Sequence, residues 1–139
     1  MTDTISKEHR SWNMSRIRGS DTKPELALRS MLHRSGFRFR LHDKSLPGRP
    51  DIVLKRYRTV IFVHGCFWHR HRNCANATTP STRPDFWNEK FRLTIQRDAR
   101  NVKELKEAGW HVITVWECEL RKQPDEVLQD IQKTLAGRH

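Results

Sequence analysis

Long apolar runs are absent from this chain of 139 residues, and no apolar segment follows its N-terminus. A membrane-spanning helix needs about 20 predominantly apolar residues in a row, and a secretory signal needs an apolar stretch near the start. We therefore expect a cytoplasmic protein with neither feature. Internal repeats, low-complexity segments and linkers are also missing, and the 35% of hydrophobic residues suffice for one modest core.

Cysteine is scarce as well. The chain has three, Cys66, Cys74 and Cys118. An odd number in a chain without a secretion signal argues against a disulfide framework. The three thiols are therefore either free or part of a metal site that a histidine completes.

Acidic residues are few relative to basic ones, since 16 Asp and Glu stand against 27 Lys and Arg and the formal net charge is +11. The excess is spread along the whole chain, which indicates a folded surface lying against a polyanion. Nucleic acid is the commonest partner of this kind, ahead of an anionic membrane or an acidic protein. Arginine outnumbers lysine, as suits forked contacts to phosphate.

The hydrophobic pattern predicts an α/β fold class, a mixed α+β sheet flanked by helices. A first helix has Thr22 as its N-cap and Pro24 in its first turn, and it closes at Gly36. These elements form one domain over residues 21–139. Residues 1–20 are interpreted as a polar, basic arm, although a frayed terminus explains their composition equally well. The other predicted elements are strands at 37–41, 51–54, 59–63 and 111–116 and helices at 84–108 and 124–136.

A long loop without periodicity follows the third predicted strand, and loops of this length in a compact domain are usually functional. Within it, the spacing Cys66-x4-His71-x2-Cys74 joins the distant Cys118 to offer three thiolates and one imidazole. That is a closed tetrahedral set for a structural zinc ion. His69 could take the place of His71, because the spacing allows either. Three unrelated buried thiols are the alternative.

Two carboxylates occupy positions that call for an explanation. Asp51 opens a strand directly after a proline, at a strand end where functional sites tend to collect. Asp98 falls, with Thr94, on the apolar stripe of the helix at 84–108, where a carboxylate is costly unless a polar partner meets it. Asp51 could instead be a simple turn residue, and Asp98 could instead form a purely structural ion pair. The apolar stripe itself uses Trp87, Phe91, Ile95, Val102 and Leu105.

Six short motifs are distributed over nearly the whole chain. They are N-M at 13–14, L-P-G-R-P-D at 46–51, V-I-F-V-H-G-C-F-W-H at 60–69, R-P-D-F-W-x-E-K at 83–90, R-D at 97–98 and V-W-E-C at 115–118. Together they closely resemble the very short patch repair (Vsr) DNA mismatch endonucleases. The resemblance implies a PD-(D/E)xK restriction-endonuclease-like core with a structural zinc site. It also implies Mg2+-dependent nicking of double-stranded DNA 5′ to the thymine of a T:G mismatch, by a nucleoid-associated monomer that works with mismatch-repair proteins.

The resemblance also assigns roles to individual residues. Asp51 would bind Mg2+ together with the backbone carbonyl of Val63, and Glu25 would lie near the waters of that ion. A capping box at the start of its helix explains Glu25 equally well. His64 stands where the general nuclease motif has its lysine and would contact the phosphate or a metal-bound water. Phe62 occupies the place of that motif's second acidic residue.

The remaining assignments concern the base, the zinc ion and the DNA. His69 would activate water as the general base, with Asp98 orienting its ring. Core anchoring is the structural alternative for the aromatic residues. The zinc ligands would be Cys66, His71, Cys74 and Cys118. The side chains that wedge into the base stack would be Met14, Phe67, Trp68 and Trp87.

Two other functions fit the same sequence. A restriction-like nuclease would cut ordinary duplex DNA without needing a mismatch. A zinc-stapled DNA-binding module would bind DNA without cutting it.

Overall fold

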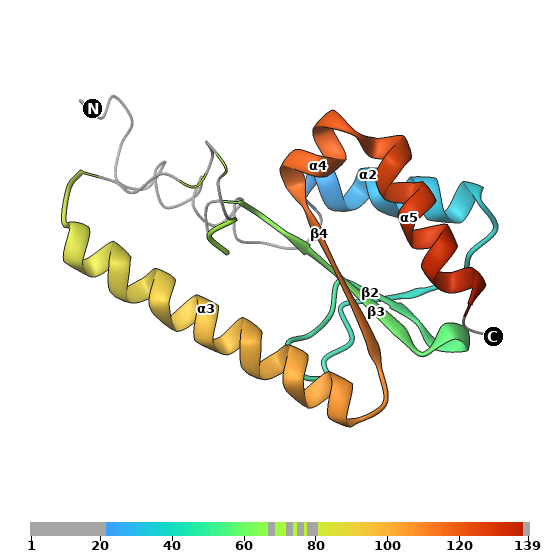
Figure 1. The fold of residues 1–139 in the computed structure, drawn as a ribbon, viewed down its shortest axis with the longest axis horizontal. Coiled ribbons are helices and arrows are strands. Elements are labelled where there is room, and N and C mark those ends of the chain that lie inside the picture. Colours follow the sequence, from blue (N-terminus) through green and yellow to red (C-terminus); the bar gives the residue numbers. More distant parts are fainter. Residues whose placement is uncertain (1–21, 67–68, 72–73, 75–76, 78–80, 138–139) are drawn as a thin grey trace.

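A four-stranded mixed sheet forms the centre of the protein in the computed structural model, which describes residues 22–137 except 67–68, 72–73, 75–76 and 78–80. The strand order is β1-β2-β3-β4, with antiparallel pairing between the first three strands and parallel pairing between β3 and β4. The predicted mixed sheet flanked by helices is thus confirmed (Figure 1). The strands are β1 (Arg40–Leu41), β2 (Ile52–Leu54), β3 (Thr59–His64) and β4 (His111–Trp116). The helices are α2 (Lys23–Arg34), the 3-10 turn η1 (Lys55–Tyr57), α3 (Pro84–Glu107), α4 (Glu117–Lys122) and α5 (Pro124–Ala136).

Helices cover both faces of the sheet, and for this reason the central strands β2 and β3 are buried at nearly every position and largely apolar. Alternate side chains of each strand enter one of two cores. One core receives Ile61 and packs against α2, α4 and α5, whereas the other receives Val60 and Phe62 and packs against α3. Figure 1 shows α3 on one side of the strands and the other three helices on the opposite side. No helix among the described residues has the length and apolar character needed to span a membrane.

The first helix begins and ends where the sequence predicts. The hydroxyl of Thr22 accepts a hydrogen bond from the Glu25 amide at 3.4 Å, and Pro24 stands in the first turn. The chain leaves the helix through Gly36, whose φ of +92° is in the left-handed region. The Glu25 side chain contacts Arg29 of the same helix and His42, which follows β1. It therefore points toward the interior and belongs to the site described below.

Two local features differ from the prediction. The predicted strand at 37–41 pairs only at Arg40–Leu41, although Phe37 and Phe39 do pack against the core. The alternation of these residues therefore indicates burial and not strand pairing. The short helix α4, which contains Cys118 and directly follows β4, is absent from the predicted elements.

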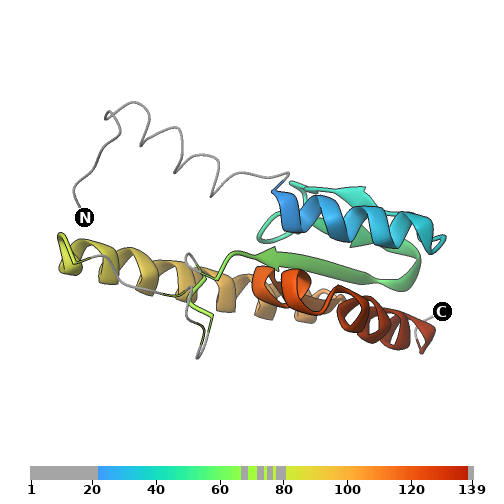
Figure 2. The same cartoon turned by 90° about the horizontal axis from the view of Figure 1, so that it is seen from above.

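Ile95 was placed on the buried stripe of α3, but its side chain is 50% exposed. The buried positions are Phe91, Thr94 and Leu105, spaced by three and eleven residues so that they share one helix face, and Thr94 takes the place assigned to Ile95. The N-terminal half of α3 extends beyond the end of the sheet, so this part of the helix has few neighbours to bury it (Figure 2).

Gly48, in the turn before β2, lies close to α3. Its φ is +76°, and a Cβ added there would come within 2.9 Å of the Asn101 side chain. We expect Gly48→Ala to lower the free energy of unfolding by about 2–3 kcal/mol, because backbone strain and a steric clash add together. Gly36→Ala is the matched control, since Gly36 also has a positive φ but no atom within 4 Å of its added Cβ. Urea unfolding should show the larger loss for Gly48→Ala, and equal losses would contradict a clash with Asn101.

Candidate functional site

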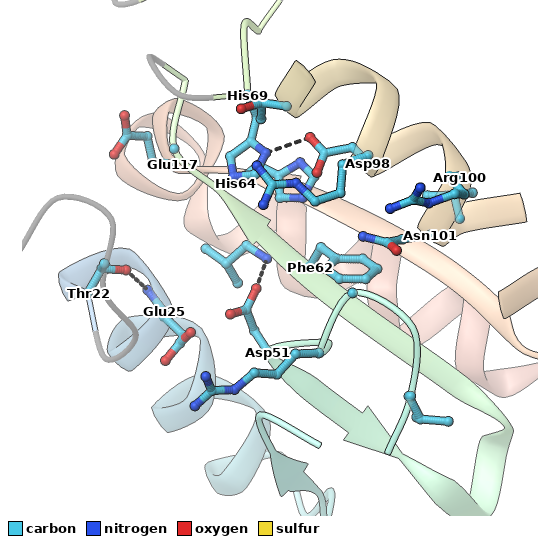
Figure 3. Close-up of a pocket in the computed structure, with 18 of the residues that line it drawn as sticks. Thr22, Glu25, Asp51, Phe62, His64, His69, Asp98, Arg100, Asn101 and Glu117 are labelled. Carbon is cyan, nitrogen blue, oxygen red and sulfur yellow. Dashed lines mark hydrogen bonds and ion pairs between the residues drawn. The ribbon is translucent and has the colours of Figure 1, made fainter. Parts of the chain in front are cut away.

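A cleft of about 940 Å3 opens between α2 and α3, where β2 begins and β3 ends. The antiparallel register brings the residue before β2 next to the last residues of β3, and this places the two conspicuous parts of the sequence side by side. Figure 3 shows Glu25 and Asp51 at one end of the cleft and His64, His69 and Asp98 at the other. Five cationic side chains also line it, namely Lys44, Arg49, Lys90, Arg97 and Arg100.

Asp51 directly precedes β2 and is held in place by the backbone of β3. Its Oδ2 accepts a hydrogen bond from the Val63 amide at 2.7 Å. Burial, and then a hydrogen bond with Glu25, raise the pKa of Asp51 to about 7, while the Val63 amide acts in the opposite direction. A carboxyl group in this environment resists carrying its charge alone and favours a nearby cation.

Glu25 faces Asp51 from α2 and is itself held by two donors. Its side chain is buried, with 2% of its surface exposed. Arg29, one helical turn later, forms an ion pair with it, and the His42 Nε2 lies 3.1 Å from Oε1 and 3.2 Å from Oε2. Sequence reasoning missed both partners. Only the i,i+4 spacing of Glu25 and Arg29 could have indicated one of them.

The chemistry of this end of the cleft suits a hard divalent cation. Ligand atoms of Glu25, His42 and Asp51 lie within 4.8 Å of one another. Mg2+ prefers carboxylate and carbonyl oxygens and keeps several waters, so a few oxygen donors at the edge of an open cleft are sufficient. The carboxylates of Glu25 and Asp51 therefore fit a magnesium ion.

Three side chains meet at the other end of the cleft. The His69 Nδ1 lies 2.6 Å from the Asp98 Oδ2, which supplies the polar partner that a carboxylate on the stripe of α3 requires. His64 stacks on His69 with ring centroids 3.8 Å apart. Burial, and then the neighbouring His69, lower the pKa of His64 to about 4, so the His64 ring is neutral at pH 7.

The four residues of the predicted zinc set come together behind the histidine pair. Ligand atoms of Cys66, His71, Cys74 and Cys118 lie within 4.8 Å of one another. The His71 Nδ1 is 3.3 Å from the Cys118 Sγ and 3.6 Å from the Cys66 Sγ. The structure thus brings His71 to the cysteines, whereas His69 is engaged with Asp98.

This cluster has the donors that zinc prefers. Burial is the main cause that raises the pKa of the Cys66 thiol to about 12, so the thiolate form needs a cation beside it. Three sulfurs and one imidazole nitrogen match a tetrahedral structural site. The amide of Cys66 donates to the Glu117 carboxylate at 3.1 Å, a second link between this loop and the start of α4 that the sequence did not reveal.

Trp116 connects the cysteine cluster to the histidine pair. Its indole stacks on His71 with centroids 4.3 Å apart, and it meets His64 edge to face at 5.3 Å. The rings of His69, His64, Trp116 and His71 therefore form one continuous packed row. A displacement of the cysteine cluster would move the histidines that line the cleft.

The predicted DNA-wedging residues are only partly described by the structure. Trp87 lies on α3 between Phe86 and Phe91 and is half-buried, and it is not among the residues that line the cleft. Met14, Phe67 and Trp68 lie outside the described residues.

Comparisons with known proteins identify a family and relatives that this chain resembles. Residues 2–76 match a family model described as "DNA mismatch endonuclease Vsr". The chain is 48% identical over 141 residues to the DNA mismatch endonuclease Vsr of Escherichia coli strain K12, covering 99% of this chain and 90% of that protein. It is 49% identical over 120 residues to the type II nicking enzyme V.XorIIP of Xanthomonas oryzae pv. oryzae, covering 86% of this chain and 88% of that enzyme.

A solved structure shares the fold. The catalytic domain of the homing endonuclease I-Bth0305I superposes with a TM-score of 0.59 at 21% identity, covering 84% of this chain and 97% of that domain. At this level of identity the likeness concerns the arrangement of the sheet and helices.

Proposed function

The chain belongs to the Vsr family of DNA mismatch endonucleases and is a DNA-nicking endonuclease, and from this premise we propose that it cuts duplex DNA 5′ to the thymine of a T:G mismatch by Mg2+-dependent phosphodiester hydrolysis. Hydrolysis would leave 3′-hydroxyl and 5′-phosphate ends. The observation that carries the proposal is the content of one cleft, in which a carboxylate pair and a histidine–aspartate pair face the same space.

We assign the carboxylate end to the binding of Mg2+. Asp51 would supply a carboxylate oxygen and Val63 its backbone carbonyl. Because the N–H and C=O of one strand residue point to the same neighbouring strand, the Val63 carbonyl lies on the side of Asp51, which its amide contacts. A magnesium ion bound there would supply Lewis-acid polarisation of the scissile phosphate. Glu25 from α2 then provides the second carboxylate that the PD-(D/E)xK pattern lacks at Phe62.

We assign the histidine end to proton transfer. The Asp98 carboxylate fixes the His69 tautomer that carries its proton on Nδ1, and this leaves Nε2 to accept a proton from the attacking water. His64, neutral and stacked on His69, holds that ring in place and offers a hydrogen-bonding nitrogen to the phosphate or to a water. Geometry and tautomer both suit His69 as the general base.

The cysteine cluster would hold a structural zinc ion through Cys66, His71, Cys74 and Cys118. These residues join the loop after β3 to α4, two segments that are far apart in the sequence. Structural zinc sites are closed and contribute directly to folding. We therefore give this cluster a supporting role, acting on the histidine pair through Trp116.

Double-stranded DNA with a T:G mismatch is the proposed substrate, bound by a monomer that mismatch-repair proteins assist. The cationic side chains of the cleft would contact phosphates. Met14, Phe67, Trp68 and Trp87 are proposed to enter the base stack. A mismatched step is easier to unstack than a paired one, so this insertion costs least at the lesion.

A nicking assay on matched T:G and T:A duplexes with Mg2+ tests the proposal. We expect one strand of the T:G duplex to be cut and the T:A duplex to remain intact, over a panel of flanking bases. Equal cutting of both duplexes would instead indicate a restriction-like nuclease. Binding of the duplexes without any cutting would indicate a zinc-stapled binding module.

Replacing Asp98 by Asn tests the assigned base. The amide can no longer favour the tautomer with a proton on His69 Nδ1, so we expect single-turnover nicking to slow by about 100-fold. Glu104→Gln is the matched control, because Glu104 is an exposed carboxylate on the same helix α3. Binding of the T:G duplex and the melting temperature should stay near wild type for both variants. A nicking rate for Asp98→Asn equal to that of Glu104→Gln would remove Asp98 and His69 from the chemistry.

A further inference from the structure

His42 is tied to Asp51 through its backbone. It follows β1 with a φ of +47°, in the left-handed region that side chains other than glycine rarely adopt. Its amide donates a hydrogen bond to the Asp51 carbonyl at 3.2 Å. Backbone strain of this kind persists only where surrounding contacts maintain it. The position of His42 relative to Asp51 is therefore fixed by the main chain.

The His42 side chain reaches across to the second carboxylate of the cleft. Its Nε2 lies 3.1 and 3.2 Å from the two Glu25 oxygens, while the nearest Asp51 oxygen, Oδ1, is 3.9 Å away. Arg29 donates to the same carboxylate, and its Nη2 lies 3.4 Å from the His42 Nε2. Glu25 is thus held by contacts to two different side chains.

The two groups that contact Glu25 belong to different elements. Arg29 belongs to α2, the helix of Glu25 itself. His42 belongs to the segment between β1 and β2, which also carries Asp51, and its Nε2 lies 3.1 Å from Glu25 Oε1 and 3.9 Å from Asp51 Oδ1. His42 therefore ties the Glu25 carboxylate to the segment that carries Asp51, which Arg29 does not do.

We propose that His42 is a positioning residue that holds the Glu25 carboxylate beside Asp51 and thereby sets how tightly the cleft binds its divalent cation. The inference rests on the proposed function, in which Asp51 and Glu25 serve a magnesium ion. Residues one step removed from a metal commonly change its affinity by about 10–100-fold when they are replaced. His42 acts through Glu25 in this role.

Two substitutions of His42 separate the effect of its side-chain length from the effect of its backbone conformation. Asn tolerates a positive φ but ends short of Glu25, whereas Gln carries an amide N–H about as far as the imidazole Nε2. We expect His42→Asn to weaken Mg2+ binding by about tenfold, measured by isothermal titration with MgCl2 on the full chain. His42→Gln should bind Mg2+ nearly as the wild type does. Nicking at saturating Mg2+ should remain close to wild type in both.

In a Glu25→Gln background, His42→Asn should cause no further loss of Mg2+ affinity, because the residue through which it acts has been neutralised.

Several results would overturn the proposal. These are wild-type Mg2+ affinity in His42→Asn, an equal loss in His42→Gln, or the same loss in the Glu25→Gln background. If the wild-type protein nicks T:G duplexes with Mg2+ but His42→Asn keeps wild-type Mg2+ affinity, only the proposed role of His42 is refuted. A wild-type protein that neither binds Mg2+ nor nicks would remove the proposed function as well.

Discussion

The variant Asp51→Asn is expected to nick T:G duplexes about 1000-fold more slowly than the wild-type protein, a loss of about 4 kcal/mol in transition-state stabilisation. The amide keeps the size of the carboxylate and can still accept the hydrogen bond from the Val63 amide, so the local fold should persist. It cannot offer the charged oxygen that Mg2+ requires. Single-turnover nicking with saturating enzyme and Mg2+ measures the effect.

In buffer without Mg2+, the same substitution is expected to stabilise the protein at pH 8. Burial and Glu25 raise the pKa of Asp51 from its ordinary 3.8 to about 7. The folded state therefore holds a proton that the unfolded chain has released between these values, and wild-type stability falls as the pH rises from 3.8 to 7. Asn is neutral at every pH, so Asp51→Asn should unfold at higher urea by about 1–2 kcal/mol at pH 8.

The control for Asp51→Asn is Asp130→Asn, which removes an exposed carboxylate from α5, outside the cleft. It should change neither nicking nor the pH dependence of unfolding. Asp51→Asn with wild-type nicking would show that the cleft does not hold the catalytic cation there. Loss of nicking together with a less stable fold at pH 8 would indicate a structural role for the carboxylate.

If the cysteine cluster holds the proposed zinc ion, replacing Cys118 by Ala is expected to release that ion and to lower the free energy of unfolding by more than about 3 kcal/mol. The Cys118 Sγ lies 3.3 Å from the His71 Nδ1 and belongs to α4, so it joins the loop after β3 to a distant part of the chain. With that link removed, Trp116 and His64 lose their packed neighbour and nicking should fall with stability. Metal content by mass spectrometry and urea unfolding measure the two effects.

The size of the loss distinguishes a zinc ligand from an ordinary buried thiol. Removing one small buried side chain costs only about 1 kcal/mol. Wild-type protein stripped of zinc by a chelator serves as the matched reference, because Cys118→Ala in that state should lose no more than this smaller amount. A substitution that costs the same with and without the chelator would contradict the zinc assignment.

The elements that the sequence predicted well are those that local chemistry determines. Thr22 and Gly36 bound α2 because capping and left-handed closure depend on neighbouring residues alone. The strands at 52–54, 59–64 and 111–116 are short segments rich in Val and Ile. Ile95 was misplaced because a helix pattern does not reveal where its neighbours end. The six-residue helix α4 is too short for periodicity to indicate it.

The site residues also divide into those that local sequence indicates and those that depend on tertiary packing. Asp98 could be singled out from sequence because a carboxylate on an apolar stripe requires a partner, and His69 is that partner. His42 could not, because its contact with Glu25 spans 17 residues and depends on how β1 is placed against α2. Spacing alone did not choose between His71 and His69 for the cysteine cluster, and the structure places His71 beside Cys118 and His69 beside Asp98 of α3.

The proposed activity depends on one cleft in which Asp51 binds a magnesium ion and His69 accepts a proton from the attacking water. Mapping the cut on a T:G duplex labelled on both strands, with Mg2+ titrated from zero, tests this most directly. We expect a single Mg2+-dependent nick immediately 5′ to the mismatched thymine by the wild-type protein, and none by Asp51→Asn over the same time. Cutting without a divalent ion, at other positions, or by Asp51→Asn at the wild-type rate would contradict it.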